Sequence, residues 1–400
     1  MTRATIALLY LRNERRTARC GATATRSIGS AYVAAVPRAS LLGDTMLKII
    51  LAASGLLGFF VVPALANPFF SSPIYPSFNA QHRDSQLTTF DAPGADDTVA
   101  VGINASGVVV GYYVAKHEYG FVRSAKGTFT KFSAKASAPT YPEAVNNNGA
   151  IVGSYEDNIS SGISHGFVRA ANGTIALFDP PGSVFTTPMA INSDGAVVGY
   201  YNDDKQIPHG FLRGAGGKIT TIDFAGAKRG TEIWCINKKG AVAGDYIDNK
   251  GAYHGFVRGA GGKFTSFDVP GAGKKKNQGT YVYGINNGGA ISGYFFTDTH
   301  KMNHGFVRAA DGTFTVFDPQ GSVGTYLGYI NATGAITGIY LANEYTTDGF
   351  VRAANGTITT FSAPGAAALG THPMGINSNS VIVGTYYDEY NNGHGFEFTP

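Results

Sequence analysis

Short apolar runs alternate with polar turns from residue 87 to residue 400. In one stretch, residues 186–192, 196–201, 209–214 and 218–223 each alternate in the manner of a β-strand, and turn residues such as Gly195 separate them. Short strands bounded by turns at roughly every 8–12 positions, with no helical periodicity, indicate an all-β chain. The pattern therefore predicts a unit of four short strands.

This unit recurs seven times, with a period of about 45 residues. Its clearest marker is an Asn followed seven residues later by a Gly, and a Gly-Phe pair follows in each copy. The marker residues are Asn104 and Gly111, Asn146 and Gly153, Asn192 and Gly199, Asn237 and Gly244, Asn286 and Gly293, Asn331 and Gly338, and Asn377 and Gly384. Units of this size cannot bury their apolar face alone, and four strands per unit are typical of a β-propeller blade.

The two ends of the repeat region complement each other. The last copy stops after its third strand at residues 396–400, and the region opens with an isolated fourth strand at residues 87–94. Joining the two completes the last unit and hides strand edges that would otherwise be open. We therefore expect residues 87–400 to form a seven-bladed β-propeller of four-stranded blades, closed by the N-terminal strand.

Residues 46–66 carry the features of an export signal. An apolar segment, residues 49–62, follows a short basic start and precedes the Ala-Leu-Ala of residues 64–66, which fits a cleavage site. The apolar segment is too short for a membrane span. We interpret residues 1–45 as an upstream extension from a misassigned translation start, or alternatively as a long basic leader, and residues 67–86 as a linker. The expected product is secreted or periplasmic, with no membrane span after cleavage.

The repeat has a recurring His-Gly-Phe tripeptide, at His165, His209, His254, His304 and His394. Together with the Gly-Ile-Asn and Phe-Asp-x-Pro-Gly segments, it resembles the HAF family of bacterial extracellular repeat proteins, whose name comes from His-Ala-Phe. The resemblance covers residues 87–400. It implies export and a repeat-built β fold, and it supplies no catalytic residues.

Charge and composition narrow the function classes. Residues 1–66 hold eight basic and two acidic residues, and the remainder holds 23 basic and 25 acidic residues. A nearly neutral repeat region does not indicate a nucleic-acid or anionic-membrane surface. We expect a monomer, and we interpret Cys235 as a small buried residue because Ile233, Trp234 and Ile236 flank it.

Residues that recur in every blade are interpreted as scaffold. A repeated set of Thr, Asn, His, Arg and Asp predicts hydrogen bonds that hold each blade together. The five His lie one to a blade, which is incompatible with a metal site, since metal ligands converge on one point. We therefore expect no metal site at these His and no cofactor, with calcium as the alternative.

Ligand-binding candidates lie where the connections vary in length, at the loops between the second and third strands. An Asp follows a strand Tyr there at a recurring spacing, which suits sugar recognition through ring stacking and hydroxyl acceptance, or oxygen ligation of calcium. The alternative is a solvated, turn-forming Asp. The candidates are Tyr155 and Asp157, Tyr201 and Asp203, Tyr246 and Asp248, Tyr386 and Asp388, and Asp298.

The innermost strands hold residues that differ between blades. Trp234, the only tryptophan, is a candidate ligand platform or an inter-blade packing residue. Glu143, Glu232 and His372 are acid/base candidates for a hydrolase or lyase with one site on the axis. No motif of a known enzyme class occurs. The hypotheses are a binding protein for carbohydrate or for a cell-envelope protein, an exported hydrolase or lyase, and a docking scaffold.

Overall fold

The computed structural model describes residues 87–400 except residues 158–162, 300–301 and 344. This part of the chain contains 28 strands, and within it no helix has the length and apolarity needed to cross a bilayer. The predicted extension, signal peptide and linker of residues 1–86 lie outside the described residues.

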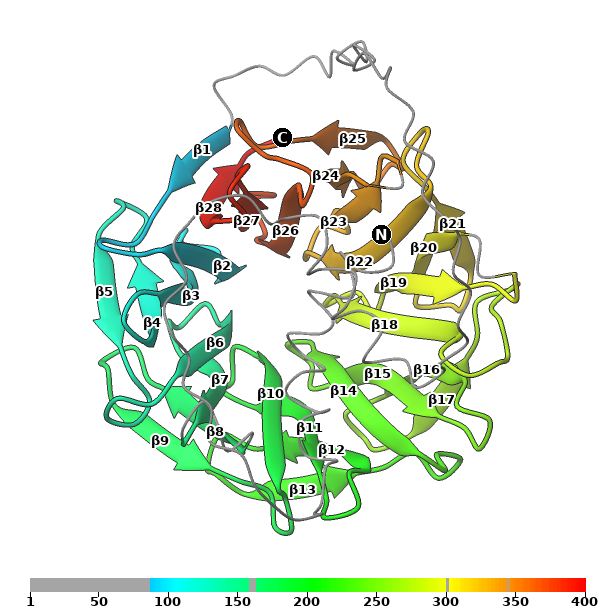
Figure 1. Ribbon diagram of the computed structural model, residues 1–400. Helices are drawn as coiled ribbons and strands as arrows, with labels where there is room; N and C mark the ends of the chain where they lie inside the picture. The colour runs from blue at the N-terminus through cyan, green and yellow to red at the C-terminus, as the bar shows by residue number, and fades with distance from the viewer. Residues whose placement is uncertain (1–86, 158–162, 300–301, 344) are drawn as a thin grey trace, which may run out of the picture. The chain divides into compact units, whose positions relative to one another are not determined.

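The described strands form groups of four antiparallel strands around one axis (Figure 1). Five groups are separate four-stranded sheets, and the other two are joined by a single parallel bridge between Tyr253 and Gly279. The prediction of an all-β propeller of four-stranded blades is therefore confirmed. We number the blades in chain order, so that β2–β5 form blade 1 and β26–β28 with β1 form blade 7.

The first strand of each blade lies next to the axis and the second lies outside it (Figure 1). The first strands are β2 (Asp97–Ile103), β6 (Thr140–Val145), β10 (Phe185–Ile191), β14 (Gly230–Ile236), β18 (Gly279–Ile285), β22 (Gly324–Ile330) and β26 (Thr371–Ile376). The second strands are β3 (Val109–Val114), β7 (Ile151–Glu156), β11 (Val197–Asn202), β15 (Val242–Ile247), β19 (Ile291–Phe296), β23 (Ile336–Leu341) and β27 (Ile382–Tyr387).

The third and fourth strands complete each blade outward. The third strands are β4 (Glu118–Arg123), β8 (Ser164–Arg169), β12 (Pro208–Arg213), β16 (Tyr253–Arg258), β20 (Asn303–Arg308), β24 (Thr347–Arg352) and β28 (Gly393–Phe398). The fourth strands are β5 (Phe129–Phe132), β9 (Ile175–Phe178), β13 (Ile219–Ile222), β17 (Phe264–Phe267), β21 (Phe314–Phe317), β25 (Ile358–Phe361) and β1 (Leu87–Phe90). β1 pairs with β28, Leu87 opposite Phe398, so the first described strand completes the last blade.

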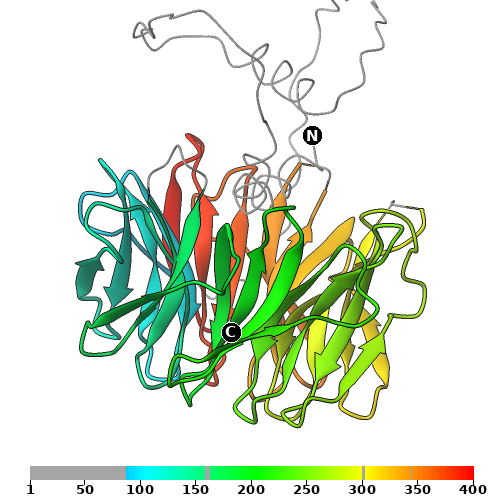
Figure 2. The same ribbon diagram turned by 90° about the horizontal axis from the view of Figure 1, so that it is seen from below.

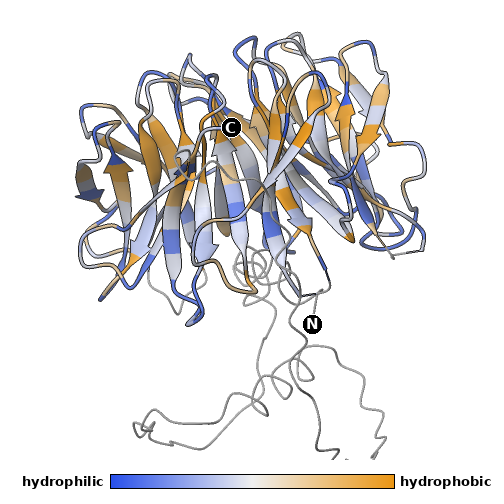
Figure 3. Ribbon diagram, turned by 90° about the horizontal axis from the view of Figure 1, so that it is seen from above, coloured by the Kyte–Doolittle hydropathy of each residue, from blue (hydrophilic) through white to orange (hydrophobic). Residues whose placement is uncertain are grey.

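Antiparallel pairing sorts the connections onto two faces (Figure 2). The turns from first to second strand begin with the motif Asn, and we call their side the Asn face. The connections from second to third strand, and from each blade to the next, lie on the opposite side, which we call the loop face. Figure 3 shows apolar residues concentrated toward the end of the blades that carries the C-terminus, which is the Asn face.

The motif Asn links six of the seven blades to the next. In blade 2, Asn146 Oδ1 accepts the backbone N–H groups of Asn148 and Ala150, at 3.0 and 2.9 Å, and fixes the turn. Its Nδ2 donates to the carbonyl oxygen of Asn192 in blade 3 at 2.9 Å. Equivalent side-chain donations leave Asn104, Asn192, Asn237, Asn331 and Asn377. The last of these reaches Asn104, so it connects blade 7 to blade 1.

The repeated Gly residues are required because other atoms of the protein lie where a Cβ would be. Each second-strand Gly faces a bulge or register shift in the first strand, and a Cβ on Gly199 would lie 2.1 Å from the carbonyl oxygen of Thr187. The Gly of the Gly-Phe pair lies under a fourth-strand ring. A Cβ on Gly255 would lie 2.5 Å from the ring of Phe267. Neither position has room for a side chain, which explains why both recur.

The Phe of each Gly-Phe pair fills an interface between neighbouring blades. All seven are at most 1% exposed: Phe121, Phe167, Phe211, Phe256, Phe306, Phe350 and Phe396. Each belongs to a cluster that spans two blades; Phe211, for example, packs with Ile191 and Val197 of its own blade and Val152 of blade 2. Burial of one aromatic ring stabilises such an interface by about 3 kcal/mol, so the blades are held together chiefly by apolar packing.

The repeated Arg makes hydrogen bonds, as predicted, and also packs on an aromatic ring. Arg123 Nη1 donates to Glu397 Oε2 of blade 7 at 3.2 Å, and Arg169, Arg308 and Arg352 each donate to a backbone carbonyl oxygen. In five blades the guanidinium also lies over a Phe ring of the preceding blade. Arg213 Cζ is 5.0 Å from the ring centroid of Phe178, and Arg352 Cζ is 5.2 Å from that of Phe317. Burial lowers the pKa of both guanidinium groups. The Arg therefore packs as a flat cation on an aromatic surface.

Replacing Asn146 with Ala is expected to destabilise the protein by about 2–4 kcal/mol, because the amide makes three hydrogen bonds worth roughly 0.5–1.5 kcal/mol each. Asn286→Ala is the matched control, since among the described residues its side chain makes one hydrogen bond, from Ala290. Urea unfolding monitored by tryptophan fluorescence measures both. Equal losses would contradict a stabilising role for the inter-blade bond.

Candidate functional site

The recurring Tyr–Asp positions on the loop face surround the repeated His. In four blades the Tyr ring stacks on the His ring, with centroids 5.0–5.2 Å apart. The stacked pairs are Tyr155 with His165, Tyr201 with His209, Tyr246 with His254, and Tyr386 with His394. The structure therefore brings the predicted ligand-binding Tyr onto a side chain of its own blade.

Each of these His lies between two carboxylates. His209 Nδ1 is 2.8 Å from Asp223 at the end of the fourth strand, and its Nε2 is 3.5 Å from Asp203 in the loop. The same arrangement surrounds His254, with Asp268 and Asp248, at 2.9 and 3.6 Å. Asp157 and Asp388 approach their His in the same way. We call this repeated Asp–His–Asp arrangement the histidine ladder.

The loop carboxylates also hold their own backbone. Asp203 Oδ1 accepts the N–H groups of Lys205 and Ile207, and Asp248 Oδ1 accepts those of Lys250 and Ala252. Asp388 does the same for Tyr390 and Asn392. Asp157 instead pairs with Lys135, and Asp298 accepts the N–H of Lys274. These carboxylates are therefore engaged within the fold, which favours the turn-forming alternative.

In blade 4 the histidine ladder raises the pKa of the His and lowers the pKa of the loop Asp. The hydrogen bond from His254 to Asp268 raises the pKa of His254, although burial opposes this. Burial would raise the pKa of Asp248, but the hydrogen bonds from Ala252 and Lys250 outweigh it and hold the pKa below its usual value. His254 and Asp248 therefore each favour their charged forms.

The axis is lined unequally by the seven blades. Five and three residues before the motif Asn, blades 1 and 3 carry Val, Thr or Met, blade 2 carries Tyr141 and Glu143, and blade 7 carries His372 and Met374. The adjacent blades 4 to 6 carry a second group, of aromatic and acidic residues. We call this second group the aromatic wall: Glu232 and Trp234 on β14, Tyr281 and Tyr283 on β18, and Tyr326 on β22. Its residues do not follow the repeat, in contrast to the scaffold around them.

Trp234 is the centre of the aromatic wall. Its ring stacks on Tyr283, with centroids 5.4 Å apart and an interplanar angle of 22°, and it also contacts Tyr200 at 5.8 Å. Behind it, Tyr281 lies parallel to Tyr294 at 5.1 Å. Trp234 is half-buried and packs between Tyr200 of blade 3 and Tyr283 of blade 5, which confirms the inter-blade packing expected for it. Its role as a ligand platform stays a prediction.

A buried carboxyl lies behind this wall. Asp245, on β15, is the cross-strand neighbour of Glu232 and is 1% exposed. Burial raises the pKa of Asp245 well above its usual range, and the charge of Glu232 adds to this. The nearby indole N–H of Trp234 acts in the opposite direction and lowers the pKa of Asp245, although it makes no hydrogen bond of ordinary geometry within the described residues. Burial and the charge of Glu232 therefore both favour the protonated form of Asp245.

Asp245 was missed from the sequence, although the repeat contained a signal for it. The residue after the second-strand Gly is aromatic, aliphatic or hydroxylic in the other six copies, and an acid in only this one: Tyr112, Ser154, Tyr200, Asp245, Tyr294, Ile339 and Thr385. A single charged residue at a buried, repeated position is expected to have a function of its own.

The three predicted acid/base residues lie on separate blades. Glu143 is on β6, Glu232 on β14 and His372 on β26 (Figure 1). Burial lowers the pKa of His372 to about 4, and its Nε2 is 2.9 Å from Thr347 Oγ1. Among the described residues no three His, Cys, Asp or Glu side chains are grouped to hold a metal ion. Cys235 is buried, and its Sγ donates to the carbonyl oxygen of Ala243, consistent with a packing role.

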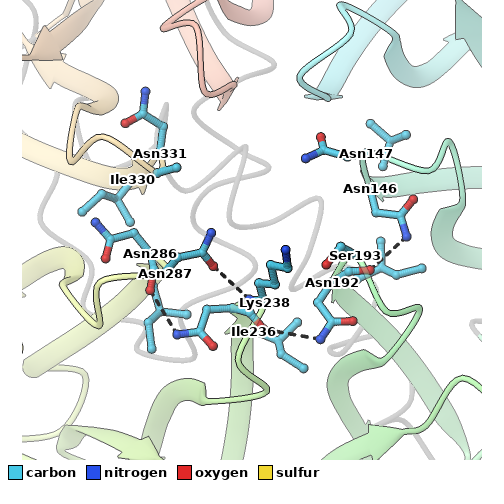
Figure 4. Close-up of a pocket in the computed structure, with 15 residues that line it drawn as sticks. Asn146, Asn147, Asn192, Ser193, Ile236, Lys238, Asn286, Asn287, Ile330 and Asn331 are labelled. Atoms are coloured by element: carbon cyan, nitrogen blue, oxygen red, sulfur yellow. Dashed lines mark hydrogen bonds between the residues drawn. The ribbon is translucent and has the colours of Figure 1, made fainter.

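A pocket of about 290 Å³ lies on the Asn face, at the first-to-second-strand turns of blades 2 to 6 (Figure 4). Its floor is a row of aliphatic side chains, and its rim consists of the motif Asn and the residue after each. The lining residues include Val145, Ile191, Ile236, Ile285, Ile330, Asn147, Ser193, Lys238, Asn287 and Ala332. The variable loops were expected to form the site, whereas this pocket lies on the face of the short, uniform turns.

No model of a known protein family matches the chain, and no curated protein matches it. Among solved structures, it is similar to streptogramin B lyase at 12% identity and a TM-score of 0.52, covering 78% of this chain and 97% of that chain. A catalytically inactive virginiamycin B lyase from Staphylococcus aureus with quinupristin matches at 12% and 0.52, covering 79% and 99%. The β-propeller domain of the Trilobed protease from Pyrococcus furiosus matches at 10% and 0.50, covering 76% and 95%. Such low identities show the β-propeller fold alone.

Replacing His254 with Gln is expected to cost more stability at about pH 5 than at about pH 9. The pKa of His254 is raised in the folded protein, so its charge contributes stability below the unfolded value of about 6.5, and this is lost as pH rises through the folded pKa. Urea unfolding at both pH values measures the difference. Tyr246→Phe is the control, because it removes only the hydroxyl contact with Ser266. A loss of unfolding free energy that is larger at pH 9 than at pH 5 would contradict the stabilising charge on His254.

Proposed function

We propose that this protein is a ligand-binding β-propeller whose ligand is a carbohydrate bound at the aromatic wall. The observation that carries the proposal is the break in the repeat: aromatic and acidic residues occupy these positions on the adjacent blades 4 to 6, and on blade 2 as Tyr141 and Glu143, where blades 1 and 3 carry Val, Thr or Met. A half-buried Trp234 offers a flat surface for a sugar ring, and the neighbouring Glu232 carboxylate accepts hydroxyl hydrogen bonds.

We place the site on this wall rather than at the repeated Tyr–Asp positions. The carboxylates of Asp203, Asp248 and Asp388 already accept two backbone N–H groups each and face a His. Their hydrogen-bonding capacity for a ligand is correspondingly smaller. Export from a bacterial cell and membership of the HAF family, both inferred from the sequence, are parts of the same proposal.

A second candidate function is a hydrolase or lyase, and one observation favours it. Asp245 and Glu232 are cross-strand neighbours with different surroundings, one buried and one half-buried at the axis. A pair of carboxyl groups with separated pKa values can serve as acid and base. The third candidate, a docking scaffold, predicted one broad apolar patch. The exposed large hydrophobic side chains of the described residues are instead distributed over blades 2, 5, 6 and 7, at Ile163, Leu177, Val316, Val323, Tyr345 and Tyr390.

The carbohydrate proposal is tested on a glycan array with the purified protein, with and without calcium. The expected result is a bound glycan class whose affinity falls about tenfold in Trp234→Ala, because a stacking surface is lost. Met189→Ala is the matched control, since Met189 occupies the equivalent position in blade 3. Binding to no glycan in either condition, or equal losses in both variants, would reject the aromatic wall as a carbohydrate site.

The enzyme alternative is tested on glycans that the array identifies, by mass spectrometry of the products after prolonged incubation. If Glu232 and Asp245 act as acid and base, cleavage appears with the wild type and falls by about 100-fold or more in Glu232→Gln and Asp245→Asn. Circular dichroism checks that both variants fold. Intact glycans after incubation with the wild type exclude this activity and leave binding as the function.

A further inference from the structure

The pocket on the Asn face has a hydrogen-bonding character of its own. Two amide oxygens on its rim accept hydrogen bonds within the protein. Asn147 Oδ1 accepts the N–H of Ala105, and Asn287 Oδ1 accepts the N–H of Lys238, each at 3.0 Å. Because an amide oxygen makes these contacts, the Nδ2 donor of each side chain must point the other way.

The chain of motif Asn bonds is interrupted at this pocket. Asn237 Nδ2 donates to the carbonyl oxygen of Asn286 at 3.1 Å, and Asn331 Nδ2 donates to that of Asn377 at 2.9 Å. Between them, Asn286 Nδ2 makes no hydrogen bond within the described residues. Asn286 is also half-buried, whereas the other six motif Asn are buried. The inter-blade series is therefore broken at Asn286, whose amide is directed away from Lys238 (Figure 4).

Lys238 adds a positive charge to these donors. Its side chain extends from the blade 4 turn toward the middle of the pocket (Figure 4), and in the described part of the chain its ammonium group has no ion-pair partner. No carboxylate lines the pocket. The acid in the neighbouring turn is Asp194, which contacts Ser193 Oγ at 3.3 Å and lies outside the lining. The rim therefore presents one cation, Lys238, and the amide donors of Asn147 and Asn287.

We infer that this pocket binds a small organic anion: a carboxylate held by Lys238 and by the amide donor of Asn287, with an apolar body on the aliphatic floor. Charge-assisted hydrogen bonds orient the carboxylate, and Ile236, Ile285 and Ile330 cover the rest of the ligand. A volume of about 290 Å³ admits one compact ring. This site lies on the Asn face and is independent of the carbohydrate proposal.

The test uses the full-length protein and three probes: benzoate, benzyl alcohol, which keeps the ring without the charge, and acetate, which keeps the charge without the ring. Ligand-observed NMR titration measures their dissociation constants. Benzoate is expected to bind most tightly. Equal affinity for benzyl alcohol would show that the charge contributes nothing, equal affinity for acetate would show that the floor contributes nothing, and either would overturn the inference.

Two variants with a matched control locate the binding. Lys238→Gln is expected to weaken benzoate binding about tenfold or more, the usual effect of losing a charged hydrogen-bond donor. Lys239→Gln removes the same charge from the next residue, which does not line the pocket, and is expected to change affinity by less than about twofold.

Asn287→Asp provides the second variant. It keeps the oxygen that accepts the N–H of Lys238, so the turn is preserved, but it replaces a donor with an anion. Benzoate binding is expected to disappear. Equal effects of Lys238→Gln and Lys239→Gln, or benzoate binding that survives Asn287→Asp, would place the anion elsewhere and overturn the inference. Thermal unfolding of each variant shows that the fold is retained.

Discussion

The hydrogen bonds of the motif Asn are the constraint on which the arrangement of blades depends. A single amide fixes the turn of its own blade through Oδ1 and connects to the backbone of the next blade through Nδ2. The spacing between blades is therefore set at the same point that reverses the chain. Apolar packing of the Gly-Phe rings supplies most of the stabilisation, but packing is non-directional, and the directional amide contacts define how one blade stands against the next.

The fold could be predicted from the sequence because its strictest requirements recur. A Gly is needed wherever a carbonyl or a ring approaches within 2–3 Å of the position a Cβ would occupy, as at Gly199 and Gly255. Such positions accept no other residue, so they appear as an invariant spacing within the chain itself. The strands of blade 3 were predicted to within one residue of β10 to β13 for the same reason.

The site was less predictable, because contacts between blades are not visible in the pattern of one blade. The Tyr–Asp spacing predicted a ligand-binding surface, but in four blades the structure places a His between two carboxylates at these positions. The packing of the Arg on an aromatic ring was not predicted, because that ring belongs to the preceding blade. Trp234 and Glu232 were identified because they depart from the repeat. Asp245 was overlooked, although it departs from the repeat in the same manner.

The pairing of β1 with β28 has a consequence for synthesis. The strand that completes blade 7 comes from residues 87–90, and its partner β28 ends at Phe398. Blades 1 to 6 can form in order as the polypeptide is synthesised. β1, however, remains unpaired until these six blades and β28 have been made. The slowest contact to form is thus also the one with the greatest separation along the chain, and a product truncated before β28 carries an open strand edge on which another chain can pair.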